Sequence, residues 1–139
     1  MTEIEVVTQF IDMQVAGDAE GMTSFLSDNV FVHYKPMEPV HSKEEWKQRM
    51  MAYDASEGFK VEILNIVGDG NGNVLTERVD SFRKKGVWID VPIMGAFTVR
   101  DGLIVNWREY YDLATFTNAL AALDEDASKA FEVSHLGGS

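Results

Sequence analysis

Three ionisable residues in the second half of the chain have types and spacings that suit acid–base chemistry. Arg78 and Asp80 stand two residues apart, and Glu109 follows in a later segment. Two carboxylates beside one guanidinium in a dry pocket resist ionising together, so one of them keeps its proton. The protonated carboxyl group can donate a proton while the ionised one deprotonates water, and Arg78 would hold both in register.

The same Arg78–Asp80 spacing also fits an exposed ion pair, which would have no catalytic role. Period-two alternation puts Thr76, Arg78, Asp80 and Phe82 on one face of the segment 74–83, and Trp107, Glu109 and Tyr111 on one face of 103–112. Both segments mix polar and apolar residues, whereas an ordinary half-buried strand separates them. The mixture favours a polar cluster inside an apolar cavity, although alternation alone does not say which face points inward.

The elements that would position these residues are an N-terminal group of helices followed by a run of strands. Apolar periodicity predicts helices over 3–16, from Asp18 as N-cap through Leu26, from the Ser42/Glu45 capping box to about Asp54, and over 113–123. Strands are expected over 29–34, 59–67, 74–83, 87–99 and 103–112. We therefore predict one α+β domain over 1–139, with a polar tail over about 124–139. Its strongly curved, mainly antiparallel mixed sheet forms a cone-shaped open barrel, and the N-terminal helices close the concave pocket.

Composition excludes several classes of function. The 139-residue chain has 23 acidic and 12 basic residues and a formal net charge of −11, which argues against binding to nucleic acid or to an anionic membrane. The absence of cysteine excludes thiolate chemistry and cysteine-ligated metals. His33, His41 and His135 show no metal-ligand spacing, so no metal site is expected. The N-terminus lacks the features of a signal peptide, and we expect a cytoplasmic protein.

Four motifs in order along residues 60–116 resemble one enzyme family. They are Leu75-Thr76-Glu77-Arg78-Val79-Asp80, Pro92-Ile93-Met94-Gly95-Ala96-Phe97, Asp101-Gly102 and Trp107-Arg108-Glu109-Tyr110-Tyr111-Asp112-Leu113. With their spacing they are similar to the limonene-1,2-epoxide hydrolases. That family has the nuclear transport factor 2-like cone, also called SnoaL-like or ketosteroid isomerase-like.

The resemblance implies a reaction and a role for each residue. Members of the family add water to an epoxide in one step, without a metal, another cofactor or a covalent intermediate. It implies that Asp80 is the acid, Arg78 the bridge and Glu109 the base, where the family has Asp. It also implies an apolar pocket lined by Phe82, Val91, Ile93, Trp107 and Phe116, a small terpene-like or alicyclic epoxide as substrate, and a homodimer.

The residues that would position the attacking water are less well defined. The family uses a Tyr and, two residues later, an Asn, just before a proline-containing loop. The simplest register puts Phe31 and His33 at these places, and Tyr34 serves if the strand is offset by one residue. A phenylalanine cannot hydrogen-bond water. Two other hypotheses therefore stay open: an epoxide-opening cyclase or isomerase of the same fold, and a non-catalytic small-molecule-binding member.

Overall fold

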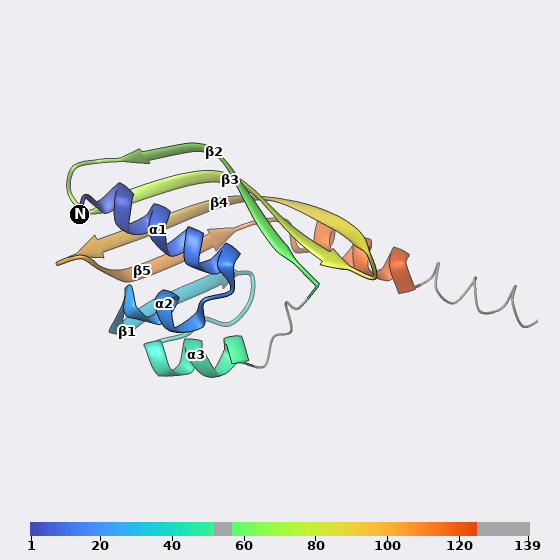
Figure 1. Ribbon diagram of the computed structural model, residues 1–139, viewed down its shortest axis with the longest axis horizontal. Helices are drawn as coiled ribbons and strands as arrows, with labels where there is room; N and C mark the ends of the chain where they lie inside the picture. The colour runs from blue at the N-terminus through green and yellow to red at the C-terminus, as the bar shows by residue number, and fades with distance from the viewer. Residues whose placement is uncertain (52–56, 125–139) are drawn as a thin grey trace, which may run out of the picture.

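The computed structural model describes residues 1–51 and 57–124, and these form an α+β arrangement (Figure 1). In chain order the elements are α1 (Glu3–Ala16), α2 (Ala19–Ser24), β1 (Leu26–Lys35), α3 (Lys43–Met51), β2 (Phe59–Gly68), β3 (Asn73–Lys84), β4 (Val87–Arg100) and β5 (Leu103–Tyr110). Residues 113–124 form a further helix. The expected polar tail lies almost wholly outside the described residues, as does the predicted end of the third helix at Asp54.

Side-chain caps fix where the N-terminal helices begin. The Thr2 hydroxyl accepts from the Glu5 amide, and the Glu5 carboxylate accepts from the Thr2 amide, which completes a capping box for α1. Asp18 accepts from the Gly21 amide at the start of α2, and Ser42 accepts from the Glu45 amide before α3. The helix starts predicted from Asp18 and Ser42 are confirmed.

The five strands form one open, mixed sheet in the order β1-β5-β4-β3-β2. β1 pairs with β5 in parallel, and every other neighbouring pair is antiparallel. Register shifts interrupt the β1–β5, β2–β3 and β4–β5 ladders, and such irregularities bend and twist a sheet. The predicted α+β class and the open, curved, mainly antiparallel sheet are confirmed.

Two strand boundaries differ from the prediction by more than one residue. β1 begins at Leu26, three residues early, because Leu26 already pairs with Ile104, and α2 therefore ends at Ser24. β5 ends at Tyr110, two residues early. The Asp112 carboxylate accepts from the Ala114 amide and so caps the helix over 113–124 instead of extending the strand.

The main apolar core lies between α1 and the concave face of the sheet (Figure 1). α1 buries Val6, Val7, Phe10 and Ile11. The Phe10 ring meets Trp107 edge-on at a centroid distance of 4.9 Å, and Trp107 stacks on Phe97 at 5.8 Å. These aromatic contacts fix α1 above β4 and β5.

A second apolar cluster occupies the other end of β3 and β4. Ile89, Val91 and Ile93 form its buried part, and Phe82 and the helix over 113–124 pack against them. That helix lies at the end of the sheet remote from the first residues of α1 (Figure 1). No helix in the described part of the chain is long and apolar enough to cross a membrane.

Replacing Phe10 by alanine should destabilise the fold strongly, because Phe10 is fully buried and its ring packs edge-on against both Phe97 and Trp107. The expected loss is about 3–5 kcal/mol in the free energy of unfolding, measured by urea denaturation. Val15→Ala is the matched control, since Val15 lies on the exposed side of the same helix and should change stability by less than about 0.5 kcal/mol. Equal losses in both variants would contradict this description of the core.

Candidate active site

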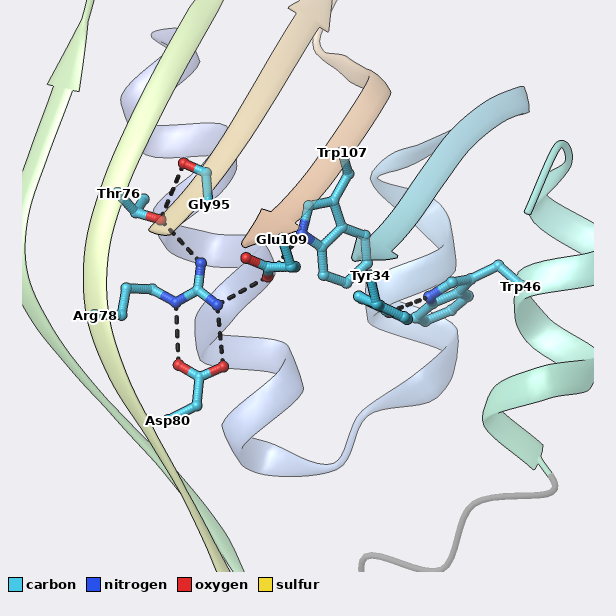
Figure 2. Close-up of polar contacts among 8 residues, drawn as sticks. All are labelled: Tyr34, Trp46, Thr76, Arg78, Asp80, Gly95, Trp107 and Glu109. Atoms are coloured by element: carbon cyan, nitrogen blue, oxygen red, sulfur yellow. Dashed lines mark hydrogen bonds and ion pairs between the residues drawn. The ribbon is translucent and has the colours of Figure 1, made fainter. Parts of the chain in front are cut away.

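β3 and β5 bring Arg78, Asp80 and Glu109 together on the concave face of the sheet (Figure 2). Nε and Nη2 of Arg78 donate to Oδ1 and Oδ2 of Asp80 at 3.1 and 3.0 Å. Nη2 also donates to Oε1 of Glu109 at 2.8 Å. The side chains of Arg78, Asp80 and Glu109 are only 1%, 4% and 5% exposed, so the exposed ion pair considered for Arg78 and Asp80 is wrong.

β4 passes between these two strands and gives the cluster its floor. Gly95 pairs with Thr76 on one side and with Glu109 on the other. A Cβ on Gly95 would lie 2.4 Å from Nη1 of Arg78 and 2.7 Å from Oε2 of Glu109. Only glycine fits here without displacing the charged groups.

The two oxygens of Glu109 have different surroundings. Oε1 accepts from Arg78 and also from Nε1 of Trp107 at 2.8 Å. Oε2 is buried and has no hydrogen-bond partner among the described residues. Burial raises the pKa of Glu109 above its usual range, and the nearby Asp80 adds to this, although the guanidinium of Arg78 acts in the opposite direction.

The charges of the cluster balance when it holds one extra proton. One guanidinium faces two carboxylates, so the fully ionised cluster has a net charge of −1 in a buried site. Burial alone would lower the pKa of Arg78, but the charges of Glu109 and Asp80 outweigh it and hold that pKa above its usual range. Arg78 therefore stays cationic, and one added proton is the change that neutralises the cluster.

The strand β1 presents Tyr34, and neither Phe31 nor His33, to this cluster. Tyr34 pairs in register with Glu109, whereas His33 pairs with Arg108, and successive residues of a strand point to opposite faces. Phe31 instead packs against His33 and His41, with ring centroids 5.9 and 5.6 Å apart. β1 therefore turns Tyr34, the alternative with the one-residue offset, towards Glu109, and turns Phe31 and His33 away from it.

Two inward-facing residues of β1 thus occupy the places expected to hold water. Val32 pairs with Trp107, is fully buried and offers no polar side-chain atom. The Tyr34 hydroxyl accepts from Nε1 of Trp46 on α3 at 3.0 Å (Figure 2). Burial among the core side chains raises the pKa of Tyr34 well above its usual range, so the hydroxyl keeps its proton. Trp46 was missed in the sequence because nothing local links α3 to β1.

Four of the five expected pocket residues lie together, and the fifth lies elsewhere. Phe82, Val91, Ile93 and Phe116 belong to the second apolar cluster. Val91 pairs with Asp80 and Ile93 with Arg78, so this cluster continues directly from the charged residues. Trp107 belongs to the main core, where its ring packs on Phe10 and its indole N–H holds Glu109.

The described residues contain no group of three or more His, Cys, Asp or Glu side chains that could hold a metal ion. The Asp69 carboxylate, in the acidic turn before β3, accepts from the backbone amides of Asn71 and Asn73. This is the geometry of a hairpin turn closed by an aspartate.

Comparison with known proteins gives a consistent family assignment. Residues 1–122 match the family model of the limonene-1,2-epoxide hydrolase catalytic domain. The chain is also 41% identical, over 56 residues, to the epoxide hydrolase EphG of Mycobacterium tuberculosis (strain ATCC 25618 / H37Rv). That match covers 40% of this chain and 37% of EphG, so the chain spans little more than a third of the curated relative it matches.

Two of the solved structures that superimpose on this chain differ in how similar their sequences are to it. An M. tuberculosis epoxide hydrolase described as LEH-like superimposes with a TM-score of 0.74 at 25% identity, covering 89% of this chain and 96% of that one. A SnoaL-like polyketide cyclase structure from Jannaschia sp. CCS1 superimposes with a TM-score of 0.75 at 18% identity, covering 86% and 92%. The second similarity shows the fold alone.

Replacing Glu109 by glutamine should stabilise the fold at alkaline pH, because it removes a buried charge and keeps the side-chain shape. The folded state holds the Glu109 proton more tightly than the unfolded state does, so ionisation of Glu109 costs stability as pH rises through the raised pKa. The melting temperature of the Glu109→Gln variant should therefore exceed that of the unsubstituted protein at pH 8, and the difference should shrink towards pH 4.

Thermal unfolding followed by circular dichroism over this pH range measures the effect, and a change of about 1 kcal/mol corresponds to roughly 3–5 °C at this chain length. Glu77→Gln is the control, because Glu77 lies on the exposed face of β3. A difference in melting temperature that does not vary with pH would contradict the burial argument.

Proposed function

The chain belongs to the limonene-1,2-epoxide hydrolase family, and from that premise we propose that it adds water to a small, apolar epoxide of a terpene-like or alicyclic kind. The observation that carries the proposal is the buried contact of one guanidinium with two carboxylates at the border of an apolar cluster. Asp80 is the acid, Glu109 is the base and Arg78 connects them.

The proposed reaction takes place in one step. Glu109 removes a proton from water while the water oxygen attacks an epoxide carbon. The bond from that carbon to the epoxide oxygen breaks, and the oxygen takes a proton from Asp80, which yields a vicinal diol. Glu109 ends protonated and Asp80 ionised, so transfer of one proton back to Asp80 restores the resting state.

The positions of the two carboxylates favour these roles. Along β3, Asp80 lies on the side of Arg78 that leads to Phe82 and the second apolar cluster. Glu109 lies level with Thr76 and Gly95, on the side of Trp107 and Tyr34. A substrate seated on the apolar cluster would meet the acid first, with the water on the Glu109 side. Attack of water opposite to the breaking carbon–oxygen bond requires such a separation.

Arg78 has two effects in this scheme. Its bidentate contact orients Asp80, and its shared Nη2 fixes the distance between the two carboxyl groups. Its charge also stabilises whichever carboxylate is ionised, before and after the proton moves. Because both states keep one cation and one anion in the cluster, the reaction does not leave an unpaired charge in the buried site.

Tyr34 is the residue that we propose to hold the attacking water. Trp46 donates to its hydroxyl oxygen, so the Tyr34 proton is left to be donated towards a water at Glu109. The family has two water-holding residues on this strand. Here Val32, which cannot hydrogen-bond, occupies one of the two inward-facing positions, so Tyr34 would hold the water without a second partner from β1. Glu109 is one methylene longer than the family's aspartate and brings its carboxylate further from β5 towards Arg78.

Val32 also gives a specific reason to consider a second reaction. A site that holds water less firmly can open an epoxide with a hydroxyl group of the substrate itself, which gives a cyclic ether in place of a diol. The cyclase structure with the same fold is compatible with this alternative. The two reactions differ in whether oxygen from water enters the product.

A homodimer is part of the proposal. Leu75, Met94 and Tyr110 are 49%, 50% and 43% exposed and lie on the outer face of neighbouring strands. Pairing of two copies through this face would remove the exposed apolar surface from water. The charged residues of the site lie on the opposite face of the same strands.

Asp80→Asn should abolish hydrolysis while the fold is kept, because asparagine cannot donate a proton to the epoxide oxygen. The assay incubates the protein with a panel of cyclic and terpene epoxides in oxygen-18 water and reads product masses. We expect labelled diol from the unsubstituted protein and at least a 100-fold lower rate from the variant. Asp90→Asn is the control on the neighbouring strand, where Asp90 accepts from Ser81 outside the cluster.

Unlabelled cyclic or isomerised product would favour the second reaction. Rapid formation of labelled diol by Asp80→Asn would remove Asp80 from the mechanism.

Tyr34→Phe should lower kcat by about 10-fold or more and leave KM nearly unchanged, because the lost hydroxyl contacts the water and not the substrate. Steady-state kinetics on the best epoxide of the panel provide the measurement. Phe31→Tyr is the matched control: its new hydroxyl faces away from Glu109 and should change neither constant. Faster turnover by Phe31→Tyr would instead support the register that puts Phe31 at the water.

A further inference from the structure

Thr76 contacts the one part of the Arg78 guanidinium that the two carboxylates leave free. Nε and Nη2 are occupied by Asp80 and Glu109, while Nη1 donates to Oγ1 of Thr76 at 2.9 Å (Figure 2). Thr76 is fully buried, and its neighbour on β4 is Gly95. The hydroxyl therefore completes the set of groups that stop the guanidinium from turning in its plane.

Thr76, Arg78 and Glu109 also converge on a single point. An atom at the Cβ position of Gly95 would lie 2.7 Å from Oγ1 of Thr76, 2.7 Å from Oε2 of Glu109 and 2.4 Å from Nη1 of Arg78. The missing side chain of Gly95 thus lets these three polar atoms approach one another above β4.

The hydroxyl hydrogen of Thr76 has a weak partner in this arrangement. Oγ1 lies 3.4 Å from the carbonyl oxygen of Gly95, which is long for a hydrogen bond between two oxygens. A threonine hydroxyl can turn its hydrogen towards a better acceptor. Oε2 of Glu109 makes no hydrogen bond among the described residues, Thr76 included, but it is buried and lies near the same point. It is therefore the acceptor available to this hydroxyl.

We propose that Thr76 is a positioning residue for the hydrolysis: its hydroxyl fixes Nη1 of Arg78 and donates to Oε2 of Glu109 whenever that carboxylate is ionised. The inference rests on the proposed function. The hydrogen bond favours the form of Glu109 that accepts a proton from water. When Glu109 becomes protonated, the hydroxyl hydrogen returns to the Gly95 carbonyl. Thr76 touches neither substrate nor water, so it acts only through Arg78 and Glu109.

The test compares Thr76→Val, which replaces the hydroxyl by a methyl group of similar size, with Thr76→Ser, which keeps the hydroxyl. The rate of diol formation is measured from pH 5 to pH 9. Without the donor, ionised Glu109 loses a hydrogen bond, so the acidic limb of kcat should move to higher pH in Thr76→Val. At pH 6 we expect its kcat to fall about 10-fold with KM within two-fold, and Thr76→Ser to keep the original limb.

Two further variants serve as controls. Thr98→Val removes a threonine hydroxyl on β4 that donates to Asn73, remote from the cluster, and should leave the pH profile unchanged. Thr76→Ala removes both the hydroxyl and the methyl group of threonine, and it replaces Thr76→Val if that variant does not fold. Circular dichroism melting shows which variants are folded.

The outcomes separate this inference from the proposed function. Labelled diol from the unsubstituted protein, with a shifted limb in Thr76→Val and an unshifted one in Thr76→Ser, would support both. Labelled diol with equal losses in the valine and serine variants and unshifted limbs would show that Thr76 only fills space, and would overturn this inference alone. Absence of any diol from the unsubstituted protein would overturn the proposed hydrolysis, and this inference with it.

Discussion

A buried guanidinium held by two carboxylates is the interaction on which the rest of this structure depends. Taking Arg78 out of water is costly unless every side of its charge meets a partner, and the partners come from two strands: Thr76 and Asp80 on β3, and Glu109 on β5. The strand between them must then lack a side chain at the point of contact, and Gly95 satisfies that requirement. A shift of register between β3 and β4, or between β4 and β5, would separate the ions, so the charged cluster and the sheet register specify each other.

The cluster also divides the interior into two regions with different tasks. On one side, Phe10 packs edge-on against Trp107, and Trp107 stacks on Phe97. These contacts fix the indole of Trp107, which donates a hydrogen bond to Glu109. On the other side, the aliphatic residues of β4 and the helix over 113–124 surround the approach to Asp80. The densely packed region thus carries the group that needs precise orientation, and the smaller cluster faces the place proposed for the substrate. If the proposed substrate site is correct, substitutions in the smaller cluster would alter substrate preference and leave the position of Glu109 unchanged.

The sequence predicted most of this arrangement because the relevant signals are local. Caps at Asp18 and Ser42 located helix starts, and period-two alternation put Arg78 and Asp80 on one face. Which residues of β1 face the site could not be predicted in this way, because the proline loop after β1 leaves its register open. Only the parallel pairing with β5 decides that Tyr34 faces Glu109. Trp46, Thr76 and Gly95 were missed as site residues for a related reason: each matters through a contact with a residue on another element. The family resemblance assigned Trp107 to the pocket, but its ring packs against Phe10 of α1 and so belongs to the main core.

The parallel pairing of β1 with β5 has a consequence for how the molecule is made. β3, β4 and β5 are joined by tight hairpins and can pair as they leave the ribosome, whereas β1 is synthesised early and has no partner until β5, the last strand, is complete. Bringing β1 and β5 together is slow, because the chain between them loses conformational entropy before the stabilising contacts between the two strands can form. Until then β5 remains an open edge, which is a hazard for association with other chains. The residues paired between β1 and β5 include Tyr34 and Glu109, so this side of the candidate site would be the last part of the protein to form.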